Sequence, residues 1–235
     1  SPKPQNPEEV SIKYNKTMPE YKLIYFPLYA RAEPIRMMLA HAKADWEDFH
    51  VGSETENKWP DFKPKMPYPH QLPVLELADG TMLTQSVAIA RFVARKFGYY
   101  PDDALLAARC DEFVDNTYNE EKVFMKTLKP AFMPDGEERE AAIKVTFEEA
   151  LPELMKRVEP LLKEDGFLFG DKPLMPDFFL GSFYWNLVEN PRTKFGVEDG
   201  KWAKFREENP KLVAYAARFK ASMGEYVDKR FEATM

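Results

Sequence analysis

Cysteine is almost absent from this 235-residue sequence, because Cys110 is the only one. A single thiol cannot form an internal disulfide, a Cys-x-x-Cys redox centre or a cysteine-rich zinc site. The three histidines, His41, His50 and His70, show no metal-ligand spacing, and no G-x-S-x-G motif is present. The sequence therefore predicts no metal site and no esterase-type nucleophile.

Long apolar runs and dense basic clusters are missing as well. The longest apolar stretch, FFLGSFYW, is far shorter than the ~20 residues of a membrane-spanning helix. The formal net charge of −6 argues against nucleic acid as a partner. The charge is uneven, about +1 over residues 1–98 and about −7 over the rest. The first part would suit a small anionic ligand, while solvated glutamate-rich helices explain the acidic part equally well.

Residues 1–19 are polar and contain four prolines, which predicts an extended tail outside the fold. An expression remnant, a terminus left by a removed targeting segment and a docking segment all fit this composition. We expect a cytoplasmic protein. An organelle, such as the mitochondrion, or secretion is the alternative if Ser1 is a processed terminus.

The next 80 residues alternate between strand and helix patterns. Strands are expected over 21–28 and 45–51, a helix over 31–44, and a proline-rich loop over 57–70. The stretch 71–98, QLPVLELADGTMLTQSVAIARFVARKFG, predicts two strands joined by an Asp79-Gly80 turn and followed by a helix that ends at Gly98. The order β-α-β-loop-β-β-α describes a complete small α/β unit.

Only helices are expected from about Pro101 onward. The apolar spacing predicts helices over 104–128, over 137–165 with a bend at Pro152, over 176–190 and within 209–231. The third of these is apolar nearly all round and is expected to be buried. The fold class is therefore α/β followed by all-α, with a boundary near residues 98–103.

Three stretches resemble the cytosolic glutathione transferases, and the sigma class most closely. They are YKLIYFPLYARAEPIR at 21–36, the stretch 71–98 quoted above, and MPDFFL at 175–180. The resemblance covers about residues 20–230. It implies a thioredoxin-like, glutathione-binding domain over 20–99 and an all-helical domain over 103–232, with the tail 1–19 outside both.

The resemblance also implies how glutathione, as co-substrate, would bind. The Leu72–Pro73 bond is expected to be cis, which leaves the backbone of Leu72 able to pair with the tripeptide as an added strand. The γ-glutamyl carboxylate is expected at the start of the helix after Gln85 and Ser86, where free amides and the helix dipole favour an anion. The expected glutathione contacts are Tyr25, Arg31, Trp59, Lys63, Gln71, Leu72, Pro73, Gln85 and Ser86.

Tyr25 is the expected catalytic residue. A thiolate is the nucleophile, and a free thiol of pKa about 8.5 is mostly protonated at neutral pH. A phenol that donates a hydrogen bond to sulfur would stabilise the thiolate. Phe26, Leu28 and Tyr29 are expected to line the neighbouring apolar substrate pocket. From the residues alone, a core aromatic of a strand is the favoured interpretation of Tyr25.

The resemblance implies an enzyme that joins the glutathione thiol to small apolar electrophiles, and isomerisation of prostaglandin-type endoperoxides is a further activity of the class. The alternative is a non-catalytic module of this fold, docked in a larger assembly through its helical half. A homodimer through the sheet edge and the helix that begins near Ala104 is expected by analogy. One departure from the sigma pattern is Tyr118, which stands where these enzymes tend to carry an acidic residue.

Overall fold

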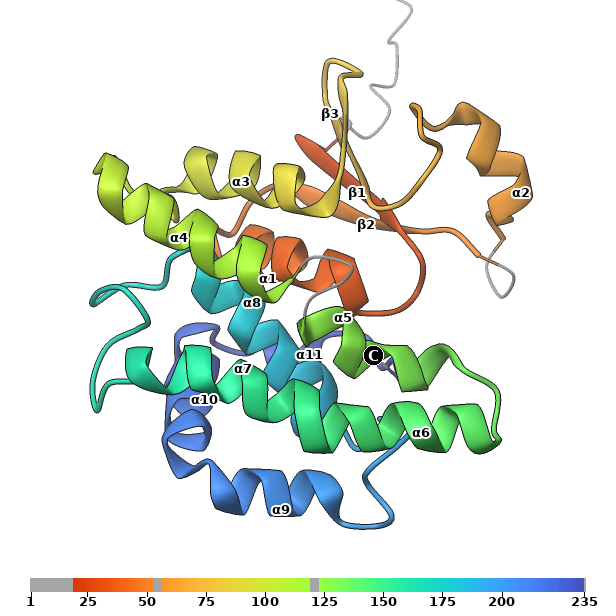
Figure 1. The fold of residues 1–235 in the computed structure, drawn as a ribbon. Helices are drawn as coiled ribbons and strands as arrows, with labels where there is room; N and C mark the ends of the chain where they lie inside the picture. The colour runs from red at the N-terminus through yellow and green to blue at the C-terminus, as the bar shows by residue number, and fades with distance from the viewer. Residues whose placement is uncertain (1–18, 53–55, 119–122, 235) are drawn as a thin grey trace, which may run out of the picture.

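A computed structural model describes residues 19–52, 56–118 and 123–234 (Figure 1). The expected tail over 1–19 therefore lies almost entirely outside the described residues. The α/β part contains a four-stranded sheet in the order β2-β1-β3-β4. Its strands are β1 (Tyr21–Tyr25), β2 (Trp46–His50), β3 (Val74–Leu77) and β4 (Met82–Thr84). Strand β1 is parallel to β2 and antiparallel to β3, which is the mixed sheet of a thioredoxin-like domain.

Three helices accompany the sheet: α1 (Glu33–His41), α2 (Trp59–Phe62) and α3 (Ser86–Phe97). The side chains of β1 alternate between two apolar clusters. Leu23 and Tyr25 belong to the main core with α1 and α3, whereas Ile24 belongs to a smaller cluster beside α2. The Asp79-Gly80 turn is present, and Gly80 has φ +84°, where a residue with a β-carbon is strained.

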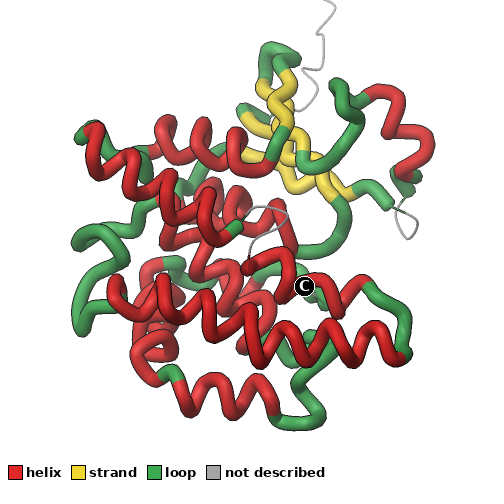
Figure 2. Tube along the Cα trace, viewed as in Figure 1, coloured by secondary structure: helices red, strands yellow, loops and turns green. Residues whose placement is uncertain are grey.

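The remainder of the described chain is helical, as Figure 2 shows by the confinement of the strands to one end. The helices are α4 (Ala104–Thr117), α5 (Val123–Leu128), α6 (Glu137–Val145), α7 (Leu151–Val158), α8 (Met175–Phe183), α9 (Lys201–Glu208), α10 (Pro210–Ser222) and α11 (Tyr226–Lys229). The expected fold class, a thioredoxin-like domain followed by helices, is confirmed. None of the helices in the described residues is long and apolar enough to cross a membrane.

Two predicted helices differ from the structure. The one over 104–128 is interrupted, since α4 ends at Thr117 and α5 begins at Val123. In the one over 137–165 the irregularity precedes Pro152: a π-helical turn at Thr146–Ala150 separates α6 from α7. Pro152 itself is the second residue of α7, which follows directly on this π-helical turn.

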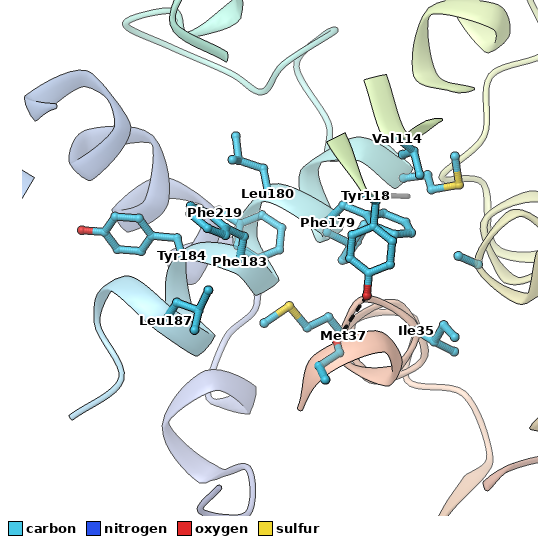
Figure 3. Packing of buried hydrophobic residues seen from close by; sticks show 14 of the residues in the cluster. Ile35, Met37, Val114, Tyr118, Phe179, Leu180, Phe183, Tyr184, Leu187 and Phe219 are labelled. Atoms are coloured by element: carbon cyan, nitrogen blue, oxygen red, sulfur yellow. Dashed lines mark hydrogen bonds between the residues drawn. The ribbon is translucent and has the colours of Figure 1, made fainter. Parts of the chain in front are cut away.

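Helix α8 is buried along its whole length, as expected, and the main core forms around it. Figure 3 shows part of this core, where side chains of α1, α4 and α8 meet. The Asp177 carboxylate caps α8 by accepting hydrogen bonds from the backbone N–H groups of Leu168 and Leu174, at 2.9 and 2.8 Å. The Tyr215 hydroxyl donates a third bond to it, at 2.6 Å.

Candidate functional site

A cleft of about 350 Å³ lies between the segment after β1, helix α2 and the start of α3. Its size is within the usual range for small-molecule sites. Two of its side chains, Arg31 and Lys63, are cationic and none is acidic, so it favours an anionic ligand. The lining residues are Phe26, Arg31, Trp59, Lys63, His70, Gln71, Leu72, Pro73, Gln85 and Ser86. The cleft thus brings together all the predicted glutathione contacts except Tyr25.

The α3 end of the cleft is suited to a carboxylate. No side chain caps the first turn of this 12-residue helix, so its leading amides face the cleft region without a side-chain acceptor. Gln85 precedes the helix with φ +69°, an unusual conformation for a residue with a β-carbon. Ser86, buried at the first helical position, adds a hydroxyl beside these amides. Helix N-termini of this kind bind anions through their free N–H groups and dipole.

The segment before β3 also lines the cleft, through Gln71, Leu72 and Pro73. The Leu72–Pro73 bond is cis, as the resemblance implied. Leu72 precedes β3 and lies outside the ladder that β3 forms with β1 and β4. Its backbone is therefore placed to pair with a short peptide in the way an added strand does. At the opposite end, the Trp59 ring packs edge-on against the Phe26 ring, with centroids 5.6 Å apart.

Tyr25 is the last residue of β1 and has 5% of its surface exposed. It does not line the cleft itself, but its neighbour Phe26 does, and so does Arg31. Burial raises the pKa of the Tyr25 phenol. A hydrogen bond from the Arg31 backbone and the positive charges of Arg31 and Arg36 lower the pKa, but the effect of burial is larger. The phenol therefore stays protonated at neutral pH. A protonated hydroxyl that already accepts a bond from Arg31 can donate its own proton to a sulfur anion.

The chain was compared with known proteins. Models of the N-terminal and C-terminal domains of glutathione S-transferases match residues 20–95 and 121–230. Glutathione S-transferase 4 of Caenorhabditis elegans is 33% identical over 77% of this chain and 86% of its own length. The chain belongs to the glutathione S-transferase family. This confirms the expected family.

Two further relatives connect this glutathione S-transferase family member with the sigma class. Hematopoietic prostaglandin D synthase of Gallus gallus is 29% identical, over 91% of this chain and 98% of its own. The structure of a sigma class glutathione S-transferase from Fasciola hepatica superposes with a TM-score of 0.74 at 27% identity, covering 92% of this chain and 99% of that one. The expected sigma-like character is therefore confirmed.

Leu28 and Tyr29, which are expected in the neighbouring apolar substrate pocket, are not among the residues that line this cleft, and their role in that pocket stays a prediction. Leu28 is half-buried and packs against the main core. The Tyr29 hydroxyl donates a 2.5 Å hydrogen bond to the Phe231 carbonyl, and the Arg230 guanidinium lies 4.0 Å from its ring centre. The C-terminal segment therefore covers Tyr29. Phe26 alone of the three faces the cleft.

A buried arginine holds the loop between β1 and α1. The Arg36 guanidinium donates to the backbone carbonyl of Leu28 at 2.8 Å and to the Asp48 carboxylate at 2.9 Å. Its fully buried side chain also lies 3.4 Å from the Glu33 carboxylate. These bonds fix the backbone that carries Phe26 and Leu28. Sequence patterns did not single out Arg36, because an Arg on a helix usually points to solvent.

One lining residue of the cleft, His70, was not predicted as a contact. It has φ +58°, and its Nδ1 lies 2.7 Å from the Met66 carbonyl oxygen. The signal for it was its position beside Gln71 in MPYPHQLP, directly before the cis proline. Within the described residues no group of three or more His, Cys, Asp or Glu side chains could hold a metal. Cys110 is buried, and burial raises the pKa of its thiol to about 12.

Proposed function

We propose that this protein is a glutathione transferase that joins the glutathione thiolate to small hydrophobic electrophiles, with Tyr25 as the activating residue. The observation that carries the proposal is the cleft itself. It combines the backbone of Leu72, which lies outside the strand ladder, a helix N-terminus at Ser86 and cations at Arg31 and Lys63. The protonated phenol of Tyr25 is next in sequence to Phe26, which lines the cleft. A tripeptide with a carboxylate at each end matches this arrangement.

In this reading each end of glutathione has a partner. The γ-glutamyl carboxylate would lie on the first turn of α3 with Ser86, and the glycine carboxylate would lie near Trp59 and Lys63. The cysteine backbone would pair with Leu72, which directs the sulfur toward Tyr25.

The reaction follows from this placement. The thiol proton leaves to solvent, and the Tyr25 hydroxyl keeps its own proton while donating a hydrogen bond to the sulfur anion. The sulfur lone pair then forms the new carbon–sulfur bond. In a substitution the leaving group departs with the electrons of its bond to that carbon, and in an addition the π electrons of the acceptor move to the neighbouring atom, which takes a proton from solvent. Lowering the thiol pKa by about two units corresponds to about 2.7 kcal/mol of thiolate stabilisation and makes the thiolate dominant at neutral pH.

The test is a titration of glutathione into the wild type and into Tyr25→Phe, with thiolate absorbance followed against pH. We expect the bound thiol to ionise near neutral pH in the wild type and near its free value in the variant. The control is Tyr21→Phe, which removes a buried hydroxyl from the same strand, where it is bonded to Glu20 rather than to the cleft. Absence of glutathione binding at millimolar concentrations would instead favour a non-catalytic module.

Two finer proposals concern assembly and location. We propose a homodimer formed through the sheet edge and α4, and a cytoplasmic location; both rest on the family alone. Light scattering of the purified protein and imaging of the tagged full chain test them. Because a prostaglandin D synthase is among the relatives, prostaglandin-type endoperoxides belong in the substrate panel.

A further inference from the structure

Tyr118 connects the helical part of the molecule to the turn that follows β1. It lies just beyond the end of α4 with 1% of its surface exposed, and its ring packs edge-on against Phe179 of α8 with centroids 4.5 Å apart. Its hydroxyl donates a hydrogen bond to the backbone carbonyl of Ala30 at 3.3 Å, across 88 positions of sequence. Figure 3 shows the hydroxyl aimed at the turn before α1.

The Ala30 carbonyl belongs to the peptide group that also contacts the Tyr25 hydroxyl. The carbonyl of Ala30 and the N–H of Arg31 are the two ends of one planar amide. The N–H end donates a hydrogen bond to the Tyr25 hydroxyl, and the carbonyl end accepts one from Tyr118. One rigid peptide group therefore links the two phenols, so a rotation that weakens one bond also disturbs the other.

This peptide group lies in strained backbone. Ala30 has φ +30°, a region that residues with a β-carbon rarely adopt, and it is 3% exposed. Such a conformation persists only when the surroundings hold it. The Tyr29 carbonyl contributes by accepting bonds from the N–H groups of Ala32 and Glu33, at 3.2 and 3.1 Å. Those bonds fix the turn on the far side of the peptide, whereas Tyr118 acts on the peptide itself.

We propose that Tyr118 is a positioning residue for Tyr25. By donating to the Ala30 carbonyl, it orients and polarises the Arg31 N–H that the Tyr25 hydroxyl accepts. A donor at one end of an amide strengthens donation from the other, and a hydroxyl that accepts a stronger bond becomes a better donor to sulfur. The inference rests on the proposed glutathione transferase activity.

The charges around this pair are few. Tyr25 and Arg31 face Tyr118, with Glu33 further along the turn, while Arg31 and Arg36 face Tyr25. Tyr118→Phe changes none of these charges and keeps the ring packed against Phe179. The variant therefore removes the hydroxyl and little else.

The first measurement is the pH titration of bound glutathione in Tyr118→Phe. At 3.3 Å the hydrogen bond is long for a hydroxyl donor, so the effect should be smaller than that of Tyr25→Phe. We expect the pKa of the bound thiol to rise by about half a unit. At pH values below that pKa, kcat/KM should fall about threefold. The rate should recover at high pH, and glutathione affinity should not change.

The control is Tyr184→Phe, which removes a buried tyrosine hydroxyl bonded to Glu189 and away from the turn. It should leave the thiol pKa at the wild-type value. A Tyr118→Phe titration that coincides with the wild type would overturn the inference, as would an equal shift in Tyr184→Phe.

A second readout separates this inference from the proposed function. In the protein without glutathione, the Arg31 amide proton should shift upfield in the NMR spectrum of Tyr118→Phe but not of Tyr184→Phe, because its hydrogen bond to Tyr25 weakens. If the wild type fails to lower the thiol pKa, the proposed function falls while the amide shift still decides the role of Tyr118. An unmoved amide shows that the hydroxyl does not position the peptide.

Discussion

The guanidinium of Arg230 lies 2.8 Å from the carboxylate of Glu33, although the two residues are 197 positions apart. Both side chains are almost completely buried, at 7% and 0% exposure. Arg230 also donates to the Asn186 side-chain oxygen and to the Trp185 carbonyl, each at 2.7 Å. Since Glu33 begins α1, this segment near the C-terminus joins the sheet-containing part to the helices around α8.

Replacing Arg230 by Gln should therefore destabilise the protein strongly. Among the described residues, Arg36 and Tyr226 would remain beside the buried Glu33 carboxylate. Loss of one partner from a buried ion pair typically costs about 3 kcal/mol or more. Urea unfolding measures the change. The control is Arg192→Gln, which breaks a solvent-exposed pair with Glu232 and should cost less than about 1 kcal/mol. Equal losses in the two variants would contradict this account.

Gly181 on α8 tolerates no side chain. A β-carbon there would lie 2.1 Å from Cε1 of the Phe219 ring, which is itself fully buried. We expect Gly181→Ala to lower the free energy of unfolding by at least ~2 kcal/mol, because neither the helix nor the ring can move without opening the core. Gly170→Ala, with no atom within 4 Å of its added carbon, should change stability by less than about 0.5 kcal/mol. A neutral Gly181→Ala would mean that the ring can move aside.

Asp48 gives stability a dependence on pH. Burial alone would raise the pKa of its carboxyl, but hydrogen bonds and charge from His50 and Arg36 outweigh this and lower the pKa below its usual 3.8. The folded protein thus keeps this carboxylate ionised at a pH where the unfolded chain protonates it. Its stabilising contribution is complete above about pH 4 and is lost as the pH falls through the folded-state value.

The variant Asp48→Asn should accordingly lose less stability than the wild type on acidification. Urea unfolding between about pH 3 and pH 6 measures both slopes. Glu47→Gln, on the exposed face of the same strand, should follow the wild type. If the free energy of unfolding depends on pH in the same way in wild type and Asp48→Asn, the Asp48 carboxyl has the same pKa in the folded and unfolded states.

Lys63 should affect glutathione affinity without affecting the reactivity of the thiol. If it faces the glycine carboxylate, Lys63→Gln removes one charge from a solvent-accessible contact, and the dissociation constant should rise about threefold to tenfold at low salt. The difference should shrink as salt is added. Lys65→Gln is the matched control, because the Lys65 ammonium lies over the Phe62 ring instead of lining the cleft. Calorimetry measures the affinity. An equal effect of both variants would show that the total positive charge near the cleft, and not a contact of Lys63, attracts glutathione.

Much of the cleft could be predicted because its residues are near neighbours in sequence. The stretch 71–98 contains a tight turn and a helix start, and each has a local signal that needs no distant partner. The cis form of the Leu72–Pro73 bond, by contrast, was expected only from the resemblance. Turn chemistry, alternation and capping act over a few residues. The same signals placed Gln85 and Ser86 at the start of α3.

The interactions of Tyr29 and Tyr118 could not be predicted for the opposite reason. Tyr29 meets the Phe231 carbonyl across 202 positions, and Tyr118 meets Ala30 across 88. Tertiary packing decides which tyrosine faces a pocket and which faces another segment, and the periodicity of one strand or helix does not contain that information. The expected pocket role of Tyr29 came from the family resemblance and stays a prediction.

The contacts of Arg230 and Phe231 also bear on how the chain is made. During synthesis Tyr29 and Glu33 are made about 200 residues before these partners, and domains generally fold as they emerge from the ribosome. The nascent sheet must therefore hold Glu33 with Arg36 alone, and Tyr29 stays uncovered until α11 follows. The contacts of Tyr29 and Glu33 with the C-terminal segment therefore form last, after nearly the whole chain has been made. A ribosome stalled before residue 226 would carry a sheet with strands in place but with this corner still open to water.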